Sequence, residues 1–143
     1  MALVKDCTFC KIIRGEIPCC KVYEDDLILA FLDIAPFNLG HTVIVPKDHQ
    51  NSITTLDEIY ANRIIKMAPK IGVALMRTIN AEGFNLFLNN GSVAGQTVWH
   101  CHMHVLPRFA GDKVVISSEP LKYDSMDQMA ELAGKLFTKL NAQ

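Results

Sequence analysis

The chain lacks both a block of like charges and a long apolar run. It has 14 Lys and Arg against 15 Asp and Glu in 143 residues, which gives a formal net charge of −1. This balance provides no basic face for nucleic acid or for an anionic membrane surface, so we expect neither partner. The longest apolar stretches, such as residues 27–32, are too short to cross a bilayer. A small anionic ligand is still compatible, because backbone amides and histidines bind phosphate without net positive charge.

A paired-cysteine framework is also missing. The chain has five cysteines, an odd number, and residues 1–6 contain no apolar run that would indicate a secretory leader. We therefore expect reduced thiols and a cytoplasmic protein. Half of the residues are hydrophobic and 20% are charged, which predicts one globular domain over residues 1–143 with a substantial core.

Apolar periodicity predicts an α+β protein. Alternating or β-branched runs bounded by turn residues predict five strands. We expect them at residues 21–24, 27–33, 41–45, 84–88 and 98–106, with Pro46 and Pro107 ending the third and the last. Strands on both sides of one long helical pattern favour a mostly antiparallel sheet.

Helical spacing and capping residues predict three helices. We expect them at 7–14, from a capping box at 55–58 to residue 79, and from a second capping box at 125–128 to about residue 140. Gly15 would end the first helix. Pro69 lies inside the second pattern and predicts a kink or a lost hydrogen bond there.

The most informative stretch is HCHMHVL at 100–106, where histidines alternate with apolar residues. On a strand, His100, His102 and His104 would share one face, while Cys101 and Met103 would point into a core. Solvated histidines are disfavoured, because histidine is not a favoured strand residue and the flanking face is apolar. Two interpretations stay open at this point. The three side chains could hold one catalytic zinc ion, or one of them could be a nucleophile oriented by its neighbours.

The segment CTFC at 7–10 contains two thiols at a spacing typical of structural zinc sites. His49 and His100 could complete a tetrahedral set, which would use only one of the alternating histidines. Two buried thiols on a short helix are the alternative. A thioredoxin-like role is disfavoured, because the following segment is not part of a βαβ unit.

Taken together, these motifs resemble the histidine-triad (HIT) family of nucleotide hydrolases and transferases. The similar segments are HCHMHVL at 100–106, CKIIRGEIP at 10–18, AFLDI at 30–34, GHTVIVPK at 40–47 with His49, and GQTV at 95–98. The resemblance covers a core at about 7–108 and little of a helical extension at about 109–143. It implies a HIT-like fold with a mostly antiparallel five-stranded sheet, one long helix and a C-terminal helix.

The resemblance implies a different role for each histidine of the triad. His102 would attack the α-phosphorus of a nucleotide and form a covalent nucleotidyl-histidine, which water then resolves. A hydrogen bond from its second ring nitrogen to a nearby carbonyl, that of His100, would fix its tautomer. His104 would contact a non-bridging phosphate oxygen. Gln96 and Thr97 would complete the catalytic set.

Further residues are implied as nucleotide ligands. Those that would hold the phosphate or the leaving group are Asn89, Gln96, Thr97 and Val98, together with His104. Asp33 would accept hydrogen bonds from the ribose hydroxyls, and His41 would lie near the sugar. Phe9, Phe31 and Ile34 would line the purine slot, although plain core packing is the alternative for these apolar side chains.

The resemblance also implies structural zinc (Zn²⁺) on Cys7, Cys10, His49 and His100, and a homodimer formed by the long helix and a sheet edge. The substrate would be a purine nucleotide conjugate. We favour nucleoside phosphoramidates such as AMP-amides, with diadenosine polyphosphates as the alternative. A non-catalytic, zinc-stabilised nucleotide-binding module is the rival class. Residues 111–123 could form a flap over the site or an arm that crosses to another copy.

Overall fold

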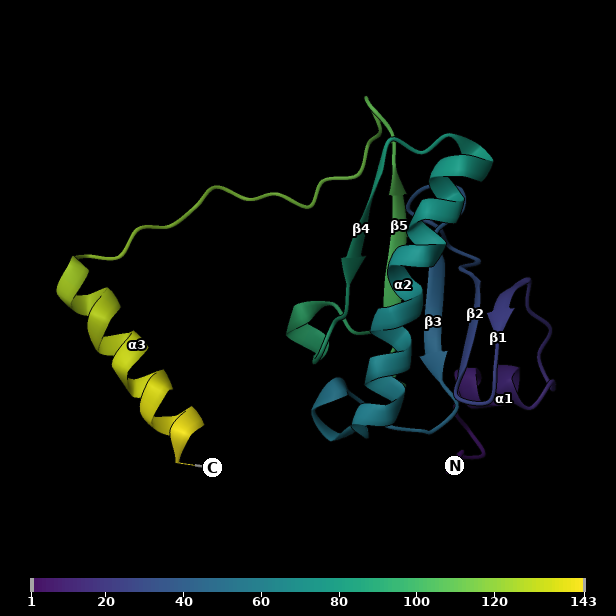
Figure 1. Ribbon diagram of the computed structural model, residues 1–143, viewed down its shortest axis with the longest axis horizontal. Helices are drawn as coiled ribbons and strands as arrows, with labels where there is room; N and C mark the ends of the chain where they lie inside the picture. Colours follow the sequence, from purple (N-terminus) through teal and green to yellow (C-terminus); the bar gives the residue numbers. More distant parts are fainter. Residues whose placement is uncertain (1, 143) are drawn as a thin grey trace.

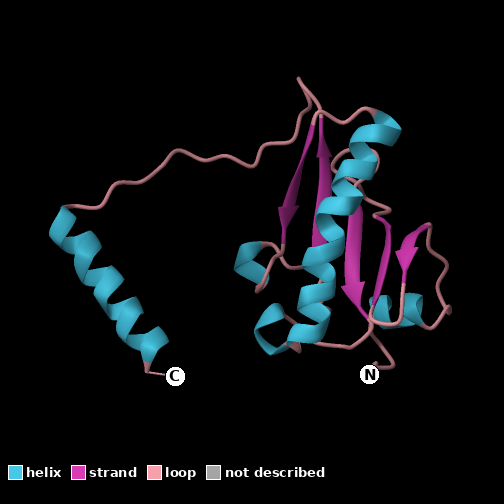
Figure 2. Ribbon diagram, viewed as in Figure 1, coloured by secondary structure: helices cyan, strands magenta, loops and turns pink. Residues whose placement is uncertain are grey.

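The computed structural model describes residues 2–142 and contains one five-stranded sheet, in the order β1-β2-β3-β5-β4, with every neighbouring pair antiparallel (Figure 1). The α+β class and the sheet type are therefore as the sequence predicts. The strands are β1 (Lys21–Glu24), β2 (Ile28–Leu32), β3 (Thr42–Pro46), β4 (Gly83–Phe87) and β5 (Met103–Arg108). The helices are α1 (Thr8–Ile13), α2 (Glu58–Ile79) and α3 (Met126–Asn141), with short 3₁₀ turns at Ile53–Thr55 and Ser92–Ala94. Figure 2 shows α2 on one face of the sheet and α3 apart from it.

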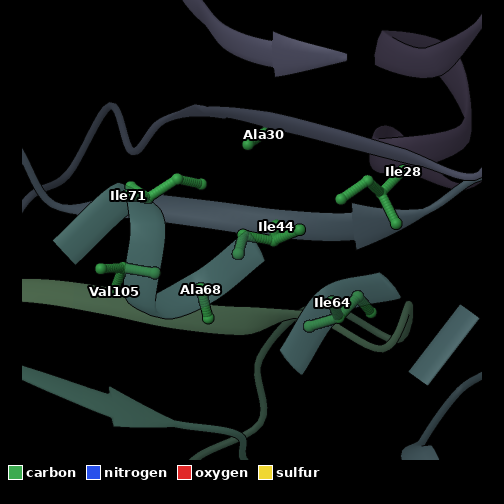
Figure 3. Packing of buried hydrophobic residues seen from close by; sticks show 7 residues of the cluster. All are labelled: Ile28, Ala30, Ile44, Ile64, Ala68, Ile71 and Val105. Carbon is green, nitrogen blue, oxygen red and sulfur yellow. The ribbon is translucent and has the colours of Figure 1, made fainter. Parts of the chain in front are cut away.

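Both faces of the central strands are covered, which explains the uninterrupted apolar run at 27–32. On the α2 face, the buried cluster contains Ile28, Ala30, Ile44, Ile64, Ala68, Ile71 and Val105 (Figure 3). On the other face, Leu29, Phe31, Val43 and Val45 pack under Phe9 and Ile12 of α1. Because successive residues of a strand point to opposite faces, β2 supplies one core with its even positions and the other with its odd positions.

The long helix begins later than the sequence predicts. Asp57, not Thr55, is its N-cap, and its carboxylate accepts a hydrogen bond from the Ile59 amide. Thr55 belongs instead to the preceding 3₁₀ turn. Pro69 does not end the helix, which continues to Ile79 and stops at Asn80 in a left-handed conformation with φ of 59°. The second capping box is confirmed, since Ser125 caps α3 through the Gln128 amide.

The histidine-bearing strand is shorter than expected at its start and longer at its end. β5 begins at Met103, so His100 and His102 precede the ladder. Before that point the chain bonds to a loop, because the Cys101 amide donates to the Gln50 carbonyl. At the other end, Pro107 lies within the strand opposite Phe84, where pairing with β3 has already stopped. A proline is tolerated there because one edge of the strand has no ladder partner.

The last part of the chain leaves the sheet. Beyond β5 it runs as an extended segment to α3, which stands apart from the sheet on the side of β4 (Figure 1). The side chains of α3 are exposed along its whole length.

Among residues 2–142, no helix combines the length and the apolar character needed to cross a membrane.

Candidate functional site

His102 lies at the centre of the site, on the face of the sheet that α1 covers. The residue is 7% exposed, and its ring contacts the Phe9 ring edge-on, with centroids 5.1 Å apart. Its Nδ1 is 2.7 Å from the backbone carbonyl oxygen of His100. Because a carbonyl oxygen only accepts, Nδ1 carries the proton and Nε2 keeps its lone pair. Burial lowers the pKa of His102, so the ring is neutral near pH 7 and can act as a nucleophile.

The tautomer of His104 is fixed through His41. The Phe37 amide donates to Nδ1 of the buried His41, at 3.2 Å, so the proton of His41 lies on Nε2. That N–H faces Nδ1 of His104 at 2.9 Å and donates to it. His104 therefore carries its own proton on Nε2, which makes that nitrogen a hydrogen-bond donor. Burial lowers the pKa of His41 and brings that of His104 to about 4, so both rings are neutral.

Packing holds His104 beside His102. The ring of Phe87, its cross-strand partner on β4, stacks on His104 with centroids 4.4 Å apart and planes 12° apart. The ring centroids of His102 and His104 are 4.8 Å apart. The sequence did not single out Phe87, because only the β4–β5 register places it against the histidine.

Asp33 follows β2 directly and approaches the same histidines. One carboxylate oxygen accepts from the Ala35 amide, and the other lies 3.9 Å from Nε2 of His41. Ligand atoms of Asp33, His41 and His104 lie within 4.8 Å of one another. Both ring nitrogens of His41 already have hydrogen-bond partners, so this group is a hydrogen-bonded cluster and a poor metal site.

The predicted purine-slot residues divide into buried and open positions. Phe31 is 5% exposed and belongs to the core cluster under α1, while Phe9 packs edge-on against it with centroids 5.6 Å apart. Ile34 is fully exposed at the turn after β2. Phe31 thus has the structural role that its apolar character alone would predict. Phe9 and Ile34 are the apolar side chains with surface available for a base.

The side chain of Gln96, an expected phosphate ligand, is buried and bonds both its own loop and the segment that follows β3. Its amide group donates to the carbonyls of Asn51 and Val98, and its oxygen accepts from the Gly91 amide. These bonds shape the turn that precedes the triad. Gln96 is therefore placed to position the loop through its side chain, which leaves no polar group free for a phosphate.

The other loop residues lie nearer the surface. Asn89 bonds weakly to the Gly95 carbonyl, at 3.4 Å. Thr97 is exposed and Val98 half-buried. Thr97 and Val98 border a hollow of about 380 Å³, whose other lining residues are Val4, Asp6, Cys7, Thr8, His49, Asn51 and Trp99.

Four potential metal ligands converge below α1, as the motif spacing predicts. The ligand atoms of Cys7, Cys10, His49 and His100 lie within 4.8 Å of one another. Nδ1 of His100 is 3.4 Å from Sγ of Cys7 and 3.5 Å from Sγ of Cys10, and Nδ1 of His49 is 3.5 Å from Sγ of Cys10. Zinc bond lengths in tetrahedral geometry require a sulfur–nitrogen separation of about 3.5 Å. The donor set and its spacing therefore fit Zn²⁺.

The two histidines of this cluster are also oriented as metal ligands. Nε2 of His100 is 2.9 Å from the Pro46 carbonyl oxygen, and Nε2 of His49 is 3.1 Å from Oδ1 of Asn51. Both contacts place the proton on Nε2 and leave the Nδ1 lone pair directed at the thiols. A single ion on all three triad histidines is not supported by residues 2–142, because His100 belongs to the cysteine cluster while His102 and His104 do not.

Known proteins resemble this chain throughout. Among sequences, it is 50% identical over 110 residues to an uncharacterized HIT-like protein of Borreliella burgdorferi, covering 75% of this chain and 78% of the relative. It is 40% identical over 124 residues to an adenylylsulfatase of Arabidopsis thaliana, covering 87% of this chain and 62% of the relative. It is also 40% identical over 102 residues to an adenosine 5′-monophosphoramidase of Schizosaccharomyces pombe, covering 71% and 74%.

Solved structures agree in fold. A crystal structure from Streptococcus mutans is 39% identical, covers 96% of this chain and 87% of its own, and has a TM-score of 0.90. A zinc-bound histidine-triad protein from Mycobacterium smegmatis is 34% identical, covers 96% and 98%, and has a TM-score of 0.74. The model of the HIT domain matches residues 14–111, which is more than half of the sequence. The chain therefore belongs to the HIT family.

Proposed function

We propose that this protein hydrolyses nucleotidyl conjugates at the α-phosphate, with His102 as the nucleophile. The substrates we favour are purine nucleoside phosphoramidates such as AMP-amides. The observation that carries the proposal is the bond from Nδ1–H of His102 to the His100 carbonyl, which leaves a lone pair on Nε2 of a neutral, buried ring. The relatives from Schizosaccharomyces pombe and Arabidopsis thaliana are named for reactions of adenylyl compounds, which supports this class of substrate.

The proposed reaction has two steps at phosphorus. In the first, Nε2 of His102 bonds to the α-phosphorus and the P–N bond to the leaving amine breaks, with the amine taking a proton from solvent. In the second, water attacks phosphorus and releases a proton to solvent, the bond to His102 breaks, and the nucleoside monophosphate leaves with the oxygen of that water. The neutral ring is restored for the next turnover.

His104 supports this reaction through the proton on its Nε2. The hydrogen bonds from the Phe37 amide to His41 and from His41 to His104 fix the tautomer that carries this N–H before substrate binds. A preset donor beside the nucleophile can bond a non-bridging phosphate oxygen and stabilise the charge that builds there. Asp33 would accept hydrogen bonds from the ribose hydroxyls, and Phe9 with Ile34 would border the base. Asn89, Thr97 and the Val98 amide would meet the phosphate or the leaving group.

Zinc is proposed as a structural ion on Cys7, Cys10, His49 and His100. When bound it would cross-link α1 to the segments that follow β3 and precede β5. The zinc-bound relative from Mycobacterium smegmatis supports this assignment. The required thiolates favour a reducing compartment such as the cytoplasm. We also infer a homodimer through α2 and the outer edge of β4, where the sheet has no further strand among residues 2–142.

The test is direct trapping of the intermediate. Incubation with radiolabelled AMP-amide, followed by an alkaline quench that preserves P–N bonds, should yield one adenylyl adduct on His102. His102→Ala should lower turnover by about 1000-fold or more while AMP still binds. An adduct on another residue, or full turnover by the alanine variant, would contradict the proposal. Loss of AMP binding with loss of activity would instead indicate misfolding, so binding is measured on the same preparation.

Comparison of leaving groups tests the favoured substrate. AMP-amide, diadenosine polyphosphate and adenylyl sulfate are compared by kcat/KM on one preparation of the enzyme. We expect the phosphoramidate to be cleaved fastest. Faster cleavage of the dinucleotide would favour the alternative hydrolase, and binding of all three without turnover would favour a non-catalytic nucleotide-binding module.

A further inference from the structure

Three consecutive residues after β3 each contact a different part of the site, and we call residues 49–51 the bridge segment. His49 is one of the four potential metal ligands. The carbonyl of Gln50 accepts a hydrogen bond of 2.7 Å from the Cys101 amide, between the first and second triad histidines. The carbonyl of Asn51 accepts from a side-chain amide of the loop that precedes the triad. The bridge segment therefore contacts the metal cluster, the triad and this loop.

One buried side chain, that of Gln96, bonds the bridge segment to the loop at residues 91–98, which we call the phosphate loop. The residue is 3% exposed, and its side-chain amide donates to the carbonyls of Asn51 and Val98. Its side-chain oxygen accepts from the Gly91 amide at 2.9 Å. Both hydrogens of the amide group and its oxygen are thereby used, so the loop cannot shift without breaking buried hydrogen bonds.

The metal side of the bridge segment is oriented by the side chain of Asn51. Its Oδ1 is 3.1 Å from Nε2 of His49, the nitrogen that carries the proton when Nδ1 faces the Cys10 thiol. A ligand histidine whose other ring nitrogen is bonded in this way keeps its ring orientation. Asn51 thus contacts the metal ligand with its side chain and Gln96 with its backbone, so it lies between the two sites.

The metal cluster and the phosphate loop also meet at the surface. They border the hollow of about 380 Å³, which is lined by His49 and Asn51 together with Thr97 and Val98. Thr97 lies between the two residues that the bond from Gln96 to the Val98 carbonyl joins, so this bond closes a turn around it. In the proposed reaction, Thr97 and the Val98 amide would meet the phosphate or the leaving group. The residues assigned to the substrate therefore belong to the turn that Gln96 holds.

These bonds make the order of the phosphate loop depend on the metal cluster. An ion on the cluster would fix the ring of His49 and, through Asn51 and Gln96, the position of the loop. It would also fix His100, which follows Val98 by two residues in the chain. A ligand that binds to a loop already ordered loses less conformational entropy on binding. Occupancy of the cluster should therefore favour binding of the nucleotide.

We propose that Asn51 and Gln96 are positioning residues that couple the metal cluster to the phosphate loop, so that metal and nucleotide each strengthen the binding of the other. The proposal rests on the proposed function and goes beyond it, since a purely structural ion would contribute to folding alone. Such coupling is reciprocal, and we expect it to be about 10-fold in affinity. It should act on KM and leave kcat nearly unchanged, because an ordered loop holds the phosphate in the ground state and in the transition state alike.

The coupling is measured as the dissociation constant of AMP for the zinc-loaded and the metal-free protein. Both are titrated by calorimetry at a temperature where circular dichroism shows that each is folded. The wild type should bind AMP about 10-fold more weakly without the ion. Gln96→Met keeps a similar volume but makes no hydrogen bond, so it should reduce this ratio to about 2-fold. An equal ratio in the two proteins, or no effect of the ion on the wild type, would overturn the proposal.

Two neighbouring amide side chains of the bridge segment give a matched comparison, which also serves if Gln96→Met does not fold. Asn51→Ala removes the bond to His49, whereas Gln50→Ala removes a side chain that bonds Asp48, at 3.4 Å, away from this path. Asn51→Ala should lower the ratio and Gln50→Ala should keep it. Asn51→Asp restores an acceptor oxygen and should recover the wild-type ratio. Equal ratios in the two alanine variants would contradict the coupling.

Cobalt in place of zinc gives a second readout that needs no metal-free protein. The visible absorption bands of Co²⁺ depend on the arrangement of its ligands, so saturating AMP should shift them in the wild type. The shift should be smaller in Gln96→Met at saturating AMP. A shift of the same size in both proteins would show that the phosphate acts on the ion directly, and it would overturn the proposal.

Turnover of AMP-amide by the zinc-loaded protein separates positioning from catalysis. Asn51→Ala should raise KM and leave kcat within about 2-fold of the wild type. A lower kcat with unchanged KM would argue against the coupling. The proposed hydrolase can fail separately, because a protein that binds AMP but cleaves no conjugate still shows or lacks the coupling in the AMP and cobalt measurements. A wild type that binds no AMP would overturn both proposals.

Discussion

Three of the five histidines have a ring nitrogen bonded to the backbone, whose donors and acceptors cannot exchange roles. His100 and His102 donate to carbonyl oxygens, and His41 accepts from an amide. Each bond therefore decides which nitrogen is left with a lone pair or a proton. His100 directs its Nδ1 lone pair at the thiols, and His102 keeps its Nε2 lone pair for an electrophile. His41 carries its proton on Nε2 and donates that N–H to His104. Identical side chains thus acquire different chemistry from their hydrogen-bond partners.

The bond between His41 and His104 predicts a graded loss of activity. His41→Leu removes the donor at similar volume, so His104 can adopt either tautomer. We expect kcat/KM to fall by about 10-fold, the equivalent of one hydrogen bond. His41→Gln keeps an N–H group and should retain more of the rate. Equal losses in the two variants would show that the volume of His41 matters and its hydrogen bond does not.

Burial of the histidines predicts the acid limb of the pH profile. A protonated His102 has no lone pair, so kcat/KM must fall as pH falls through its pKa. Burial holds the pKa of His102 below 6.5, and burial with the nearby His102 and His41 brings that of His104 to about 4. The acid limb should therefore lie below pH 6.5. A midpoint of kcat/KM at or above 6.5 would contradict the buried, neutral site.

At the scale of elements, α2 can lie close to the sheet because Gly72 has no side chain. Gly72 faces the Phe84 ring of β4, and any Cβ there would meet ring atoms at 2.5 Å. The helix also continues through Pro69, which is exposed and so does not disturb the packed face. On the same strand, Phe87 stacks on the ring of His104.

The same substitution in two helices should have opposite effects. Gly72→Ala forces α2 away from Phe84 and should lower the free energy of unfolding by about 1–3 kcal/mol, as overpacking does. Gly134→Ala in α3 meets no atom within 4 Å and should not destabilise, because alanine favours helix by about 1 kcal/mol. Urea unfolding monitored by circular dichroism measures both. Similar destabilisation in both variants would contradict the close contact at Gly72.

At the scale of the whole molecule, the cysteine and histidine cluster joins segments that are far apart in the chain. Cys7 caps α1 and Cys10 lies within it, His49 follows β3, and His100 precedes β5. An ion on these residues would hold α1, and with it Phe9, over His102. Metal binding at such a site contributes directly to folding free energy.

Chelation should therefore destabilise the protein before it affects chemistry. Removal of zinc should lower the melting temperature, and activity should decline only as the protein unfolds. Cys10→Ser should act in the same way, whereas Cys20→Ser, at an exposed thiol outside the cluster, should not. Differential scanning calorimetry and turnover are measured on the same samples. Immediate loss of activity in a fully folded protein would point instead to a catalytic metal.

Several features of this protein are determined by sequence alone because they depend on local spacing. The apolar run at 27–32 predicts a strand, which the structure has as β2, and the capping box at 125–128 predicts where α3 begins. Residue type and spacing allow the CTFC thiols to pair with His49 and His100, the resemblance to the HIT family implies this set, and the geometry agrees with it. The spacing of apolar residues and the chemical type of each side chain can be seen in the sequence without knowing which segments pack together in the fold.

Only the tertiary structure decided which groups the site histidines meet. His41 and His104 are 63 positions apart, and His100 and Pro46 are 54 apart, so their contacts depend on strand register and loop course. For the same reason, β5 begins only at Met103, the side chain of Gln96 bonds the distant Asn51 carbonyl, and α3 stands away from the sheet. Hydrogen-bond partners distant in the chain leave no local pattern, because any residue's own sequence neighbourhood is compatible with many such partners.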